Sequence, residues 1–178
     1  MTIFPTDIAD LLIIQPQIFQ DNRGYFFECF TQKKWANLEL EYNWIQDNES
    51  KSSYGVIRGL HFQTGDHAQA KLVRVIHGKV LDVVVDLRKE QPTYGKSYSI
   101  ILSGENKRQL LIPRGFAHGY GVLEDETIFA YKCDNYYHKD SESGIHCEDV
   151  SLEIDWLIPA EKRIISEKDL VLPLLKNL

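Results

Sequence analysis

The chain has 178 residues, of which 43% are hydrophobic and 26% are charged, as is usual for a folded globular protein. This length predicts one domain that spans residues 1–178 and buries a sizeable core. A net charge of −6 provides no overall attraction for nucleic acid, so we expect no nucleic-acid partner.

The N-terminal sequence predicts an extended arm followed by a turn and a strand. Residues 1–20 contain short apolar pieces broken by Pro5 and Pro16, which is typical of an arm with one or two strands. The sequence D-N-R-G at 21–24 is a turn signal, and the aromatic segment 25–30 favours a strand.

A helix and another strand are predicted next. Residues 32–40 have helical character, with Trp35 and Leu38 three positions apart. Residues 44–48 predict a short strand, and the polar stretch 49–54 follows it.

The central part of the chain has the pattern of consecutive antiparallel strands. Gly78 marks a hairpin turn at 77–79, and Asp82 and Asp86 share one face of the strand after it. The apolar face of that strand consists of Leu81, Val83, Val85 and Leu87. Further strands are predicted at 98–102, 109–112, 120–123 and 127–133. Turn signals between them argue for an antiparallel sandwich or barrel rather than βαβ units.

The last part of the chain predicts little regular structure. Residues 157–178 form a C-terminal extension of the domain, in which Ser166 is the N-cap of a short helix that Pro173 limits. The expected fold class is therefore all-β, with a few short peripheral helices.

Cysteine usage and the N-terminus favour a cytoplasmic location. Cys29, Cys133 and Cys147 are odd in number and lack the paired spacing of a zinc ribbon or a disulfide scaffold. No basic segment precedes an apolar stretch and a cleavage site, so we expect no secretory signal. The apolar run 11–14 is far too short to cross a membrane, and we expect no membrane partner.

The sequence carries no motif for a metal or a nucleotide cofactor. Its six histidines are dispersed, and position 63, two residues after His61, is a glutamine. Neither a nucleophile elbow nor a glycine-rich phosphate loop is present. We expect no metal and no cofactor, and a metal-dependent protein is the less favoured hypothesis.

Acid–base chemistry is the remaining hypothesis, and the segment R-G-L-H-F-Q at 58–63 is its centre. An imidazole such as His61 can remove a proton near neutral pH, although a lone histidine on a strand is more often structural. Arg58 and Lys71 place charge inside strand-like segments, which is costly without a purpose. Strict alternation puts Arg58 and His61 on opposite faces, so both can face one pocket only if the strand bulges or starts between them, and Gly59 is placed to allow this.

Nine motifs follow one another along nearly the whole chain. They are D-N-R-G-Y-F-F-E (21–28), Q-D-N-E-S-K-S (46–52), R-G-L-H-F-Q (58–63), A-K-L-V-R-V (70–75), P-T-Y-G-K (92–96), N-K-R-Q-L-L-I-P-R-G-F-A-H-G (106–119), Y-K-C-D-N-Y-Y (131–137), I-D-W (154–156) and S-E-K-D (166–169). Together they resemble the dTDP-4-dehydrorhamnose 3,5-epimerases of the cupin superfamily. The resemblance implies a cupin jelly roll, a β-sandwich or barrel that works without metal or other cofactor.

The resemblance also implies roles for the residues at matching positions. His61 corresponds to the base and Asp169 to the carboxylate that orients it. Tyr131 corresponds to the acid on the opposite face of the sugar, and Lys71 to the cation beside the C4 oxygen. Substrate contacts are implied for Arg23, Glu28, Gln46, Asn48, Arg58, His118, Glu142, Lys168 and, stacked on thymine, Tyr137.

The implied reaction inverts C3 and C5 of dTDP-4-dehydro-6-deoxy-D-glucose and yields dTDP-4-dehydro-L-rhamnose, an intermediate of polysaccharide biosynthesis. Both carbons flank the C4 ketone, so their hydrogens are acidic and one enolate-stabilising group serves both centres. Arg23 and Arg58 suit the pyrophosphate because guanidinium pairs bidentately with phosphate oxygens. The resemblance further implies a homodimer with exchanged strands, in which the arm 1–20 joins the sheet of a second copy.

The sequence is also compatible with two related functions. One is an epimerase of a single centre, C3 or C5, of a related nucleotide 4-ketosugar; the other is a cupin that binds a sugar nucleotide without turnover. Gly121 stands where a bulkier apolar residue is usual. A pocket opened at this position would affect whether one or both carbons react.

Overall fold

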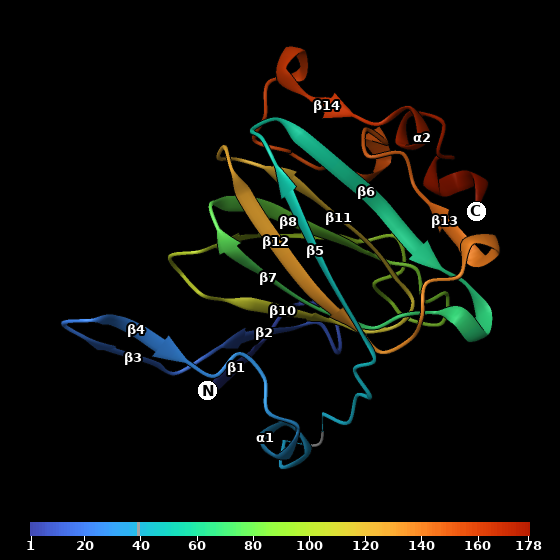
Figure 1. Cartoon of the computed structure of the whole chain (residues 1–178). Helices are drawn as coiled ribbons and strands as arrows, with labels where there is room; N and C mark the ends of the chain where they lie inside the picture. The colour runs from blue at the N-terminus through green and yellow to red at the C-terminus, as the bar shows by residue number, and fades with distance from the viewer. Residues whose placement is uncertain (39) are drawn as a thin grey trace.

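The computed structural model describes residues 1–38 and 40–178, and it is built mainly of two packed β-sheets (Figure 1). The first sheet has the order β1-β2-β10-β7-β12-β5. Its strands are β1 (Thr2–Pro5), β2 (Leu12–Gln15), β5 (Gln46–Ser52), β7 (Lys71–His77), β10 (Gln109–Ile112) and β12 (Thr127–Cys133). Every neighbouring pair in this sheet is antiparallel.

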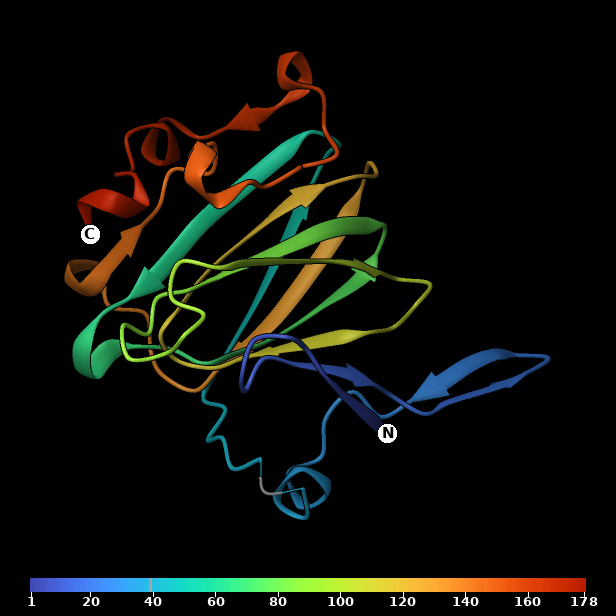
Figure 2. The same cartoon turned by 180° about the vertical axis from the view of Figure 1, so that it is seen from behind.

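The second sheet has the order β13-β6-β11-β8-β9, with the short β14 parallel to β6. Its strands are β6 (Val56–Gln63), β8 (Lys79–Asp86), β9 (Ser97–Ser103), β11 (Phe116–Val122), β13 (Glu142–Gly144) and β14 (Ile164–Ile165). The fold is a cupin-type jelly roll, as expected from the sequence. The C-terminal segment, which comprises the residues after β13 (145–178), lies beside β6 in the view from behind (Figure 2).

β8 lies in the middle of the molecule and is buried on both faces. Val80 and Val84 pack between the two sheets, with Phe129 of β12 in the same cluster. The apolar face predicted from the sequence points the other way, where its side chains meet Trp156 and Ile158 of the C-terminal segment. A run of β-branched residues suits this position because both faces exclude water.

The helices are short and peripheral. They are α1 (Gln32–Ala36), α2 (Glu167–Leu170) and five 3₁₀ turns at Gly65–His67, Lys139–Ser141, Val150–Leu152, Ala160–Lys162 and Leu175–Asn177. Among the described residues, no helix has the length and apolar character that a membrane span requires.

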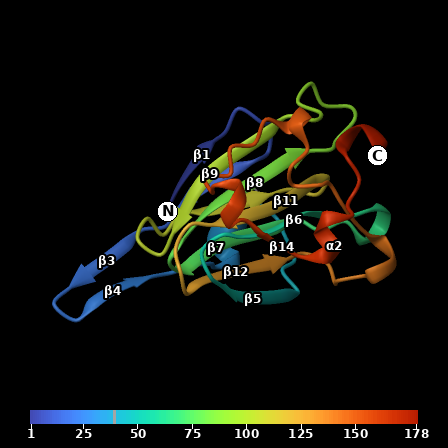
Figure 3. The same ribbon diagram turned by 90° about the horizontal axis from the view of Figure 1, so that it is seen from above.

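The hairpin of β3 (Ile18–Asp21) and β4 (Gly24–Phe27) forms a separate two-stranded sheet. It extends away from both large sheets, which is clear from above (Figure 3). The turn predicted at 21–24 is the turn of this hairpin, and its aromatic residues Phe19, Tyr25 and Phe26 are exposed.

Several boundaries differ from the sequence prediction. The strand predicted at 44–48 is observed as β5 and continues to Ser52, into the predicted polar stretch, because its polar side chains alternate between half-buried and exposed positions. β11 begins at Phe116, four residues before the predicted start, because its first residues pair with the end of β8. The helix predicted over 32–40 ends at Ala36, and the prediction for residue 39 lies outside the described residues.

Candidate active site

A cavity of about 530 Å³ lies between the two sheets. Lys71 and Tyr131 reach it from β7 and β12 of the first sheet. Arg58, His61 and His118 reach it from β6 and β11 of the second sheet. The structure thus brings together residues that are far apart in the sequence and that sequence analysis had singled out.

An irregularity in β6 lets Arg58 and His61 line the same cavity. The register between β6 and β11 shifts between the pairs His61–His118 and Arg58–Tyr120. Gly59 lies between them with a φ of +112°, and a Cβ there would come within 2.7 Å of the His118 carbonyl oxygen. Only glycine fits this position, which confirms the bulge required by the sequence argument.

His61 is paired with a buried carboxylate from the C-terminal segment. Its Nε2 lies 2.7 Å from Oδ1 of Asp169, and the other oxygen of Asp169 accepts a hydrogen bond from the Gly59 amide at 3.3 Å. The Asp169 side chain is only 5% exposed. Because an ionised carboxylate only accepts, Nε2 of His61 is the donor and Nδ1 is left as a proton acceptor.

Two effects act on the Asp169 carboxyl. Burial raises its pKa, but the hydrogen bond and charge of His61, together with hydrogen bonds from Gly59 and Ser166, outweigh burial, so the pKa lies below its ordinary value. Helix α2 fixes the position of this carboxylate, because the Ser166 side chain accepts a hydrogen bond from the Asp169 amide. The predicted N-cap is therefore part of what holds the His61 partner in place.

Tyr131 and Lys71 stand on neighbouring strands of the opposite sheet. Burial raises the pKa of Tyr131 to about 12, so the phenol keeps its proton at neutral pH. Burial lowers the pKa of Lys71, and this effect is opposed by Cys133, Asp82 and Glu142. The pair offers a proton donor and a cation at one wall of the cavity.

His118 is buried beside an aspartate that sequence analysis did not include in the site. Its Nε2 lies 3.0 Å from Oδ2 of Asp82, whose side chain is fully excluded from solvent. Burial lowers the pKa of His118, although Asp82 opposes the effect. The signal in the sequence was the single carboxylate of Asp82 within the apolar run 80–85.

A second cavity of about 140 Å³ shares His61, Lys71 and Tyr131 with the first. It adds Gln46, Asn48, Tyr137 and Glu142, four residues that the resemblance assigns to substrate contact. Lys168, also in that set, lines the larger cavity.

These residues already bond to one another. Glu142 accepts hydrogen bonds from the Tyr137 hydroxyl at 2.8 Å and from Lys168 at 2.6 Å. Gln46 accepts from the Tyr137 amide at 3.0 Å and donates to Asn48 at 3.1 Å. These hydrogen bonds hold the polar groups in fixed positions relative to one another.

The Arg58 end of the larger cavity contains hydroxyl groups that sequence analysis missed. Arg58 donates to the Ser52 hydroxyl from Nε and Nη2 at 3.3 and 3.2 Å. Ser50 and Tyr120 share a hydrogen bond of 2.7 Å between their hydroxyls. The alternation in β5, which places Ser50 and Ser52 on one face, could have indicated both serines.

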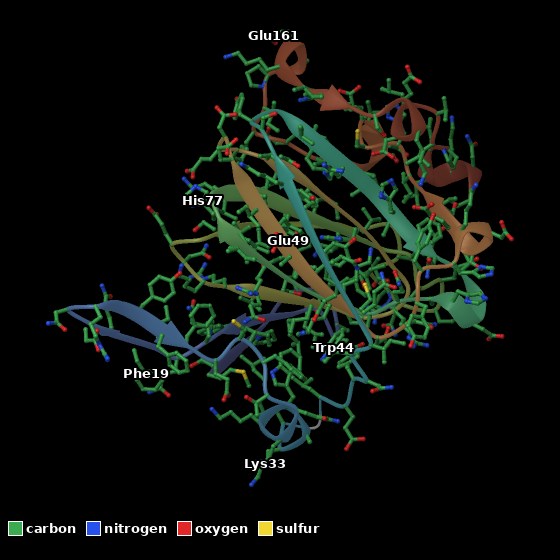
Figure 4. The ribbon with its side chains drawn as sticks, viewed as in Figure 1. Phe19, Lys33, Trp44, Glu49, His77 and Glu161 are labelled. Atoms are coloured by element: carbon green, nitrogen blue, oxygen red, sulfur yellow. The ribbon has the colours of Figure 1, made fainter. Side chains whose placement is uncertain are left out.

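Arg23 and Glu28 are not brought to this cavity. Arg23 lies in the turn of the β3–β4 hairpin and pairs with Asp21 at 2.6 Å. Glu28 follows β4 and pairs with Lys34 at 2.7 Å. Phe19 of the same hairpin lies well apart from the side chains packed between the sheets (Figure 4).

Gly121 does not open the cavity, so the expectation attached to it is wrong. It is absent from the residues that line either cavity. A Cβ at this position would approach Trp156 to 3.0 Å and Ile158 to 3.1 Å. The missing side chain makes room for the C-terminal segment on the outer face of β11.

Within the described residues, no three His, Cys, Asp or Glu side chains gather in a way that could hold a metal ion.

The chain is similar over nearly its whole length to one enzyme family. The sequence model of the dTDP-4-dehydrorhamnose 3,5-epimerases matches residues 5–177. The dTDP-4-dehydrorhamnose 3,5-epimerase of Shigella flexneri is 48% identical over 171 residues, which cover 96% of this chain and 93% of that protein.

Solved structures agree with the sequence comparison. The crystal structure of dTDP-4-dehydrorhamnose 3,5-epimerase from Elizabethkingia anophelis matches with a TM-score of 0.95 and 51% identity, and covers 99% of this chain and 97% of that chain. The dTDP-6-deoxy-D-glucose-3,5-epimerase of Legionella pneumophila, in complex with dTDP-4-keto-L-rhamnose, matches with a TM-score of 0.94 and 48% identity. That match covers 98% of this chain and 93% of the Legionella chain.

Proposed function

The chain belongs to the dTDP-4-dehydrorhamnose 3,5-epimerase family, and we propose that the cavity between its sheets carries out the family's reaction. The enzyme is an isomerase that epimerises dTDP-4-dehydro-6-deoxy-D-glucose at C3 and C5. The observation that carries the site assignment is the His61–Asp169 pair, which shares one cavity with Tyr131 and Lys71.

His61 is the base in this proposal. Asp169 holds the ring through Nε2, so Nδ1 is available to take a proton from carbon. The ionised carboxylate also stabilises the imidazolium that forms. A C–H bond next to the C4 ketone is acidic enough for such a base, because the resulting carbanion delocalises onto the C4 oxygen as an enolate.

Lys71 and Tyr131 complete the reaction. The Lys71 ammonium stabilises the negative oxygen of the enolate, an electrostatic contribution of about 3–4 kcal/mol in comparable sites. Tyr131 donates its proton to the carbon from the face opposite His61, which inverts the centre. Its raised pKa of about 12 supports this role, since the phenol remains protonated at neutral pH.

The two epimerisations use the same groups because C3 and C5 both flank the C4 ketone. After the first inversion His61 carries one extra proton and Tyr131 lacks one. His61 releases its proton to solvent and Tyr131 takes one up, so that the same pair can invert the second carbon. The chemistry is proton transfer throughout and leaves the sugar at the same oxidation level.

The remaining polar residues are proposed to hold the nucleotide. Arg58 suits the pyrophosphate, and Tyr137 offers an exposed ring to stack on thymine. Further substrate contacts are proposed for Gln46, Asn48, His118, Glu142 and Lys168.

We further propose a homodimer in which Arg23 and Glu28 serve the cavity of a second copy. Both lie in or beside the projecting hairpin, and a two-stranded hairpin alone is only marginally stable in water. Its exposed Phe19, Tyr25 and Phe26 favour burial against another surface. The exchange of the 1–20 arm remains part of this proposal, although β1 and β2 also extend the sheet of their own chain.

We also propose that the enzyme acts in the cytoplasm. Cys29, Cys133 and Cys147 are free thiols, as is usual in a reducing compartment.

Solvent exchange tests the proposed function directly. In D₂O, the wild-type enzyme should introduce deuterium at C3 and C5 of dTDP-4-dehydro-6-deoxy-D-glucose, which NMR detects at each carbon. His61→Ala should reduce exchange at both carbons by roughly 100-fold or more, because it removes the base. Exchange at one carbon alone would identify a single-centre epimerase, and binding without any exchange would identify a sugar-nucleotide-binding protein. Wild-type exchange rates in His61→Ala would reject the assignment of the base.

A further inference from the structure

Asp82 is a buried carboxylate for which the mechanism above gives no role. It stands in β8 at 0% exposure. Oδ2 bonds to Nε2 of His118, and among the described residues Oδ1 has no hydrogen-bond partner. Buried polar atoms are almost always paired, and a charged one without compensation is costly. Because its partner His118 lines the larger cavity, this carboxylate lies directly behind the cavity wall, which indicates a function for its charge.

Lys71 is the cation that the negative charge of Asp82 can stabilise. Among the residues that the structure describes, its ammonium makes no salt bridge. Three ionisable groups raise its pKa against the effect of burial, namely Cys133, Asp82 and Glu142. The ionisable groups that line the two cavities with Lys71 are Glu49, Arg58, His61, His118, Tyr120, Tyr131, Cys133, Tyr137, Glu142, Lys168 and Asp169, and Asp82 lies behind them, bonded to His118.

Two of the three groups cannot supply the negative charge as well as Asp82 can. Burial raises the pKa of Cys133 to about 11, so its thiol is neutral near pH 7. Glu142 is already bonded to Lys168 and Tyr137. Asp82 therefore remains as the carboxylate whose second oxygen, Oδ1, has no hydrogen-bond partner among the described residues.

We propose that Asp82 is a positioning residue that orients His118 and supplies the negative charge that keeps Lys71 protonated beside the substrate's C4 oxygen. The proposal rests on the epimerase function proposed above. It assigns Asp82 no proton transfer and no contact with the reacting carbons.

The protonation states of the three groups follow from their surroundings. Burial lowers the pKa of His118, so the ring is neutral and donates its Nε2 proton to Asp82. Burial raises the pKa of Asp82 above its ordinary value, although the hydrogen bond from His118 and the charge of Lys71 act in the opposite direction. An ionised Asp82 behind a protonated Lys71 leaves the cavity wall with a cation directed at the ketone.

Asp82→Asn tests this inference, because it keeps the shape of the side chain and removes the charge. We expect kcat for epimerisation to fall roughly 10-fold or more, while the Kd for dTDP changes less than about twofold. Without the anion, the pKa of Lys71 falls further, so the alkaline limb of the kcat profile should move to lower pH by about one unit. Titration of the ¹⁵N-labelled Lys71 ammonium by NMR should show the same displacement.

Asp86→Asn is the matched control. Asp86 lies four residues along the same strand and is equally buried, but it pairs with Arg88 and Thr93 outside the cavity. This variant should lower Tm and leave kcat and the alkaline limb unchanged. A purely structural role for Asp82 would make the two variants behave alike, and the inference would then be wrong.

A double-mutant cycle and the wild-type protein provide independent checks. In a Lys71→Met background, Asp82→Asn should change the residual rate less than about twofold, because the charge has lost its target; a further large loss would contradict the inference. If Asp82→Asn does not fold, ¹³C NMR of the Asp82 carboxyl in the wild-type enzyme decides, since a protonated carboxyl at pH 7 would overturn the proposal. Absence of wild-type deuterium exchange would instead count against the proposed function itself.

Discussion

At the scale of single residues, the proposed catalytic groups obtain their roles from their surroundings. Asp169 keeps one nitrogen of His61 occupied, and a buried environment keeps the Tyr131 phenol protonated. Base and acid are thus distinguished by their surroundings as well as by their chemistry.

Tyr131→Phe should separate proton removal from inversion. Proton abstraction by His61 continues, but the carbon can only be reprotonated from the side on which it lost its proton. Deuterium should therefore enter the substrate with its configuration retained, while formation of the epimer falls by roughly 100-fold or more. Parallel NMR measurements of deuterium incorporation and product formation in D₂O check this. Equal loss of both processes would show that Tyr131 is needed for abstraction too.

The sequence predicted most of these residues but not their neighbours. His61, Lys71 and Tyr131 belong to recognisable motifs, whereas the contact of Asp82 with His118 depends on the pairing of β8 with β11. Ser50 and Tyr120 come together from opposite sheets, and such a contact has no signature in local sequence. Side-chain pairs across a sandwich depend on register, which short-range patterns do not define.

At the scale of elements, glycines set how closely strands approach their neighbours. Gly59 permits the irregularity in β6, and the sequence indicated it because two charged side chains had to share a face. Gly121 was interpreted wrongly, since its neighbours Trp156 and Ile158 come from a segment more than thirty residues away. The same residue type therefore serves the cavity at one position and core packing at another.

Gly121→Val should destabilise the fold without changing which carbons react. The new side chain would collide with Trp156 and Ile158, and displacing the C-terminal segment should lower the free energy of unfolding by about 1–3 kcal/mol. Denaturant unfolding measures this loss, and Gly121→Ala should show a smaller one. The ratio of deuterium at C3 to that at C5 should match the wild-type ratio. A change in this ratio would show that residue 121 does influence which carbon reacts.

At the scale of the whole molecule, the composition and strand pattern were sufficient for the fold class, but not for the projecting hairpin. Two layers of alternating strands bury one main core between them and a second beneath the C-terminal segment. We propose that residues 1–178 form a single domain, because β8 contributes to both cores. The exposed aromatic residues of β3 and β4 belong to neither.

Mixing inactive variants tests the proposed dimer. A chain with Arg23→Ala and a chain with His61→Ala should each have low activity. When the two are co-expressed in equal amounts, about a quarter of all active sites should be intact, so activity should recover to about a quarter of the wild-type value. Recovery is expected because one cavity of each mixed dimer then has an intact His61 and an intact Arg23. The control pair His61→Ala and Tyr131→Phe should recover nothing, since both residues serve the same cavity. No recovery with the first pair, or a monomer in solution scattering, would contradict the proposal.

His61 and Asp169 are separated by 108 positions, and this separation affects when the active site can form during synthesis of the chain. The ribosome synthesises every strand that the structure describes before it reaches Asp169. The nascent protein can therefore form most of its sheets while its imidazole still lacks a partner, and activity should arise only late in translation.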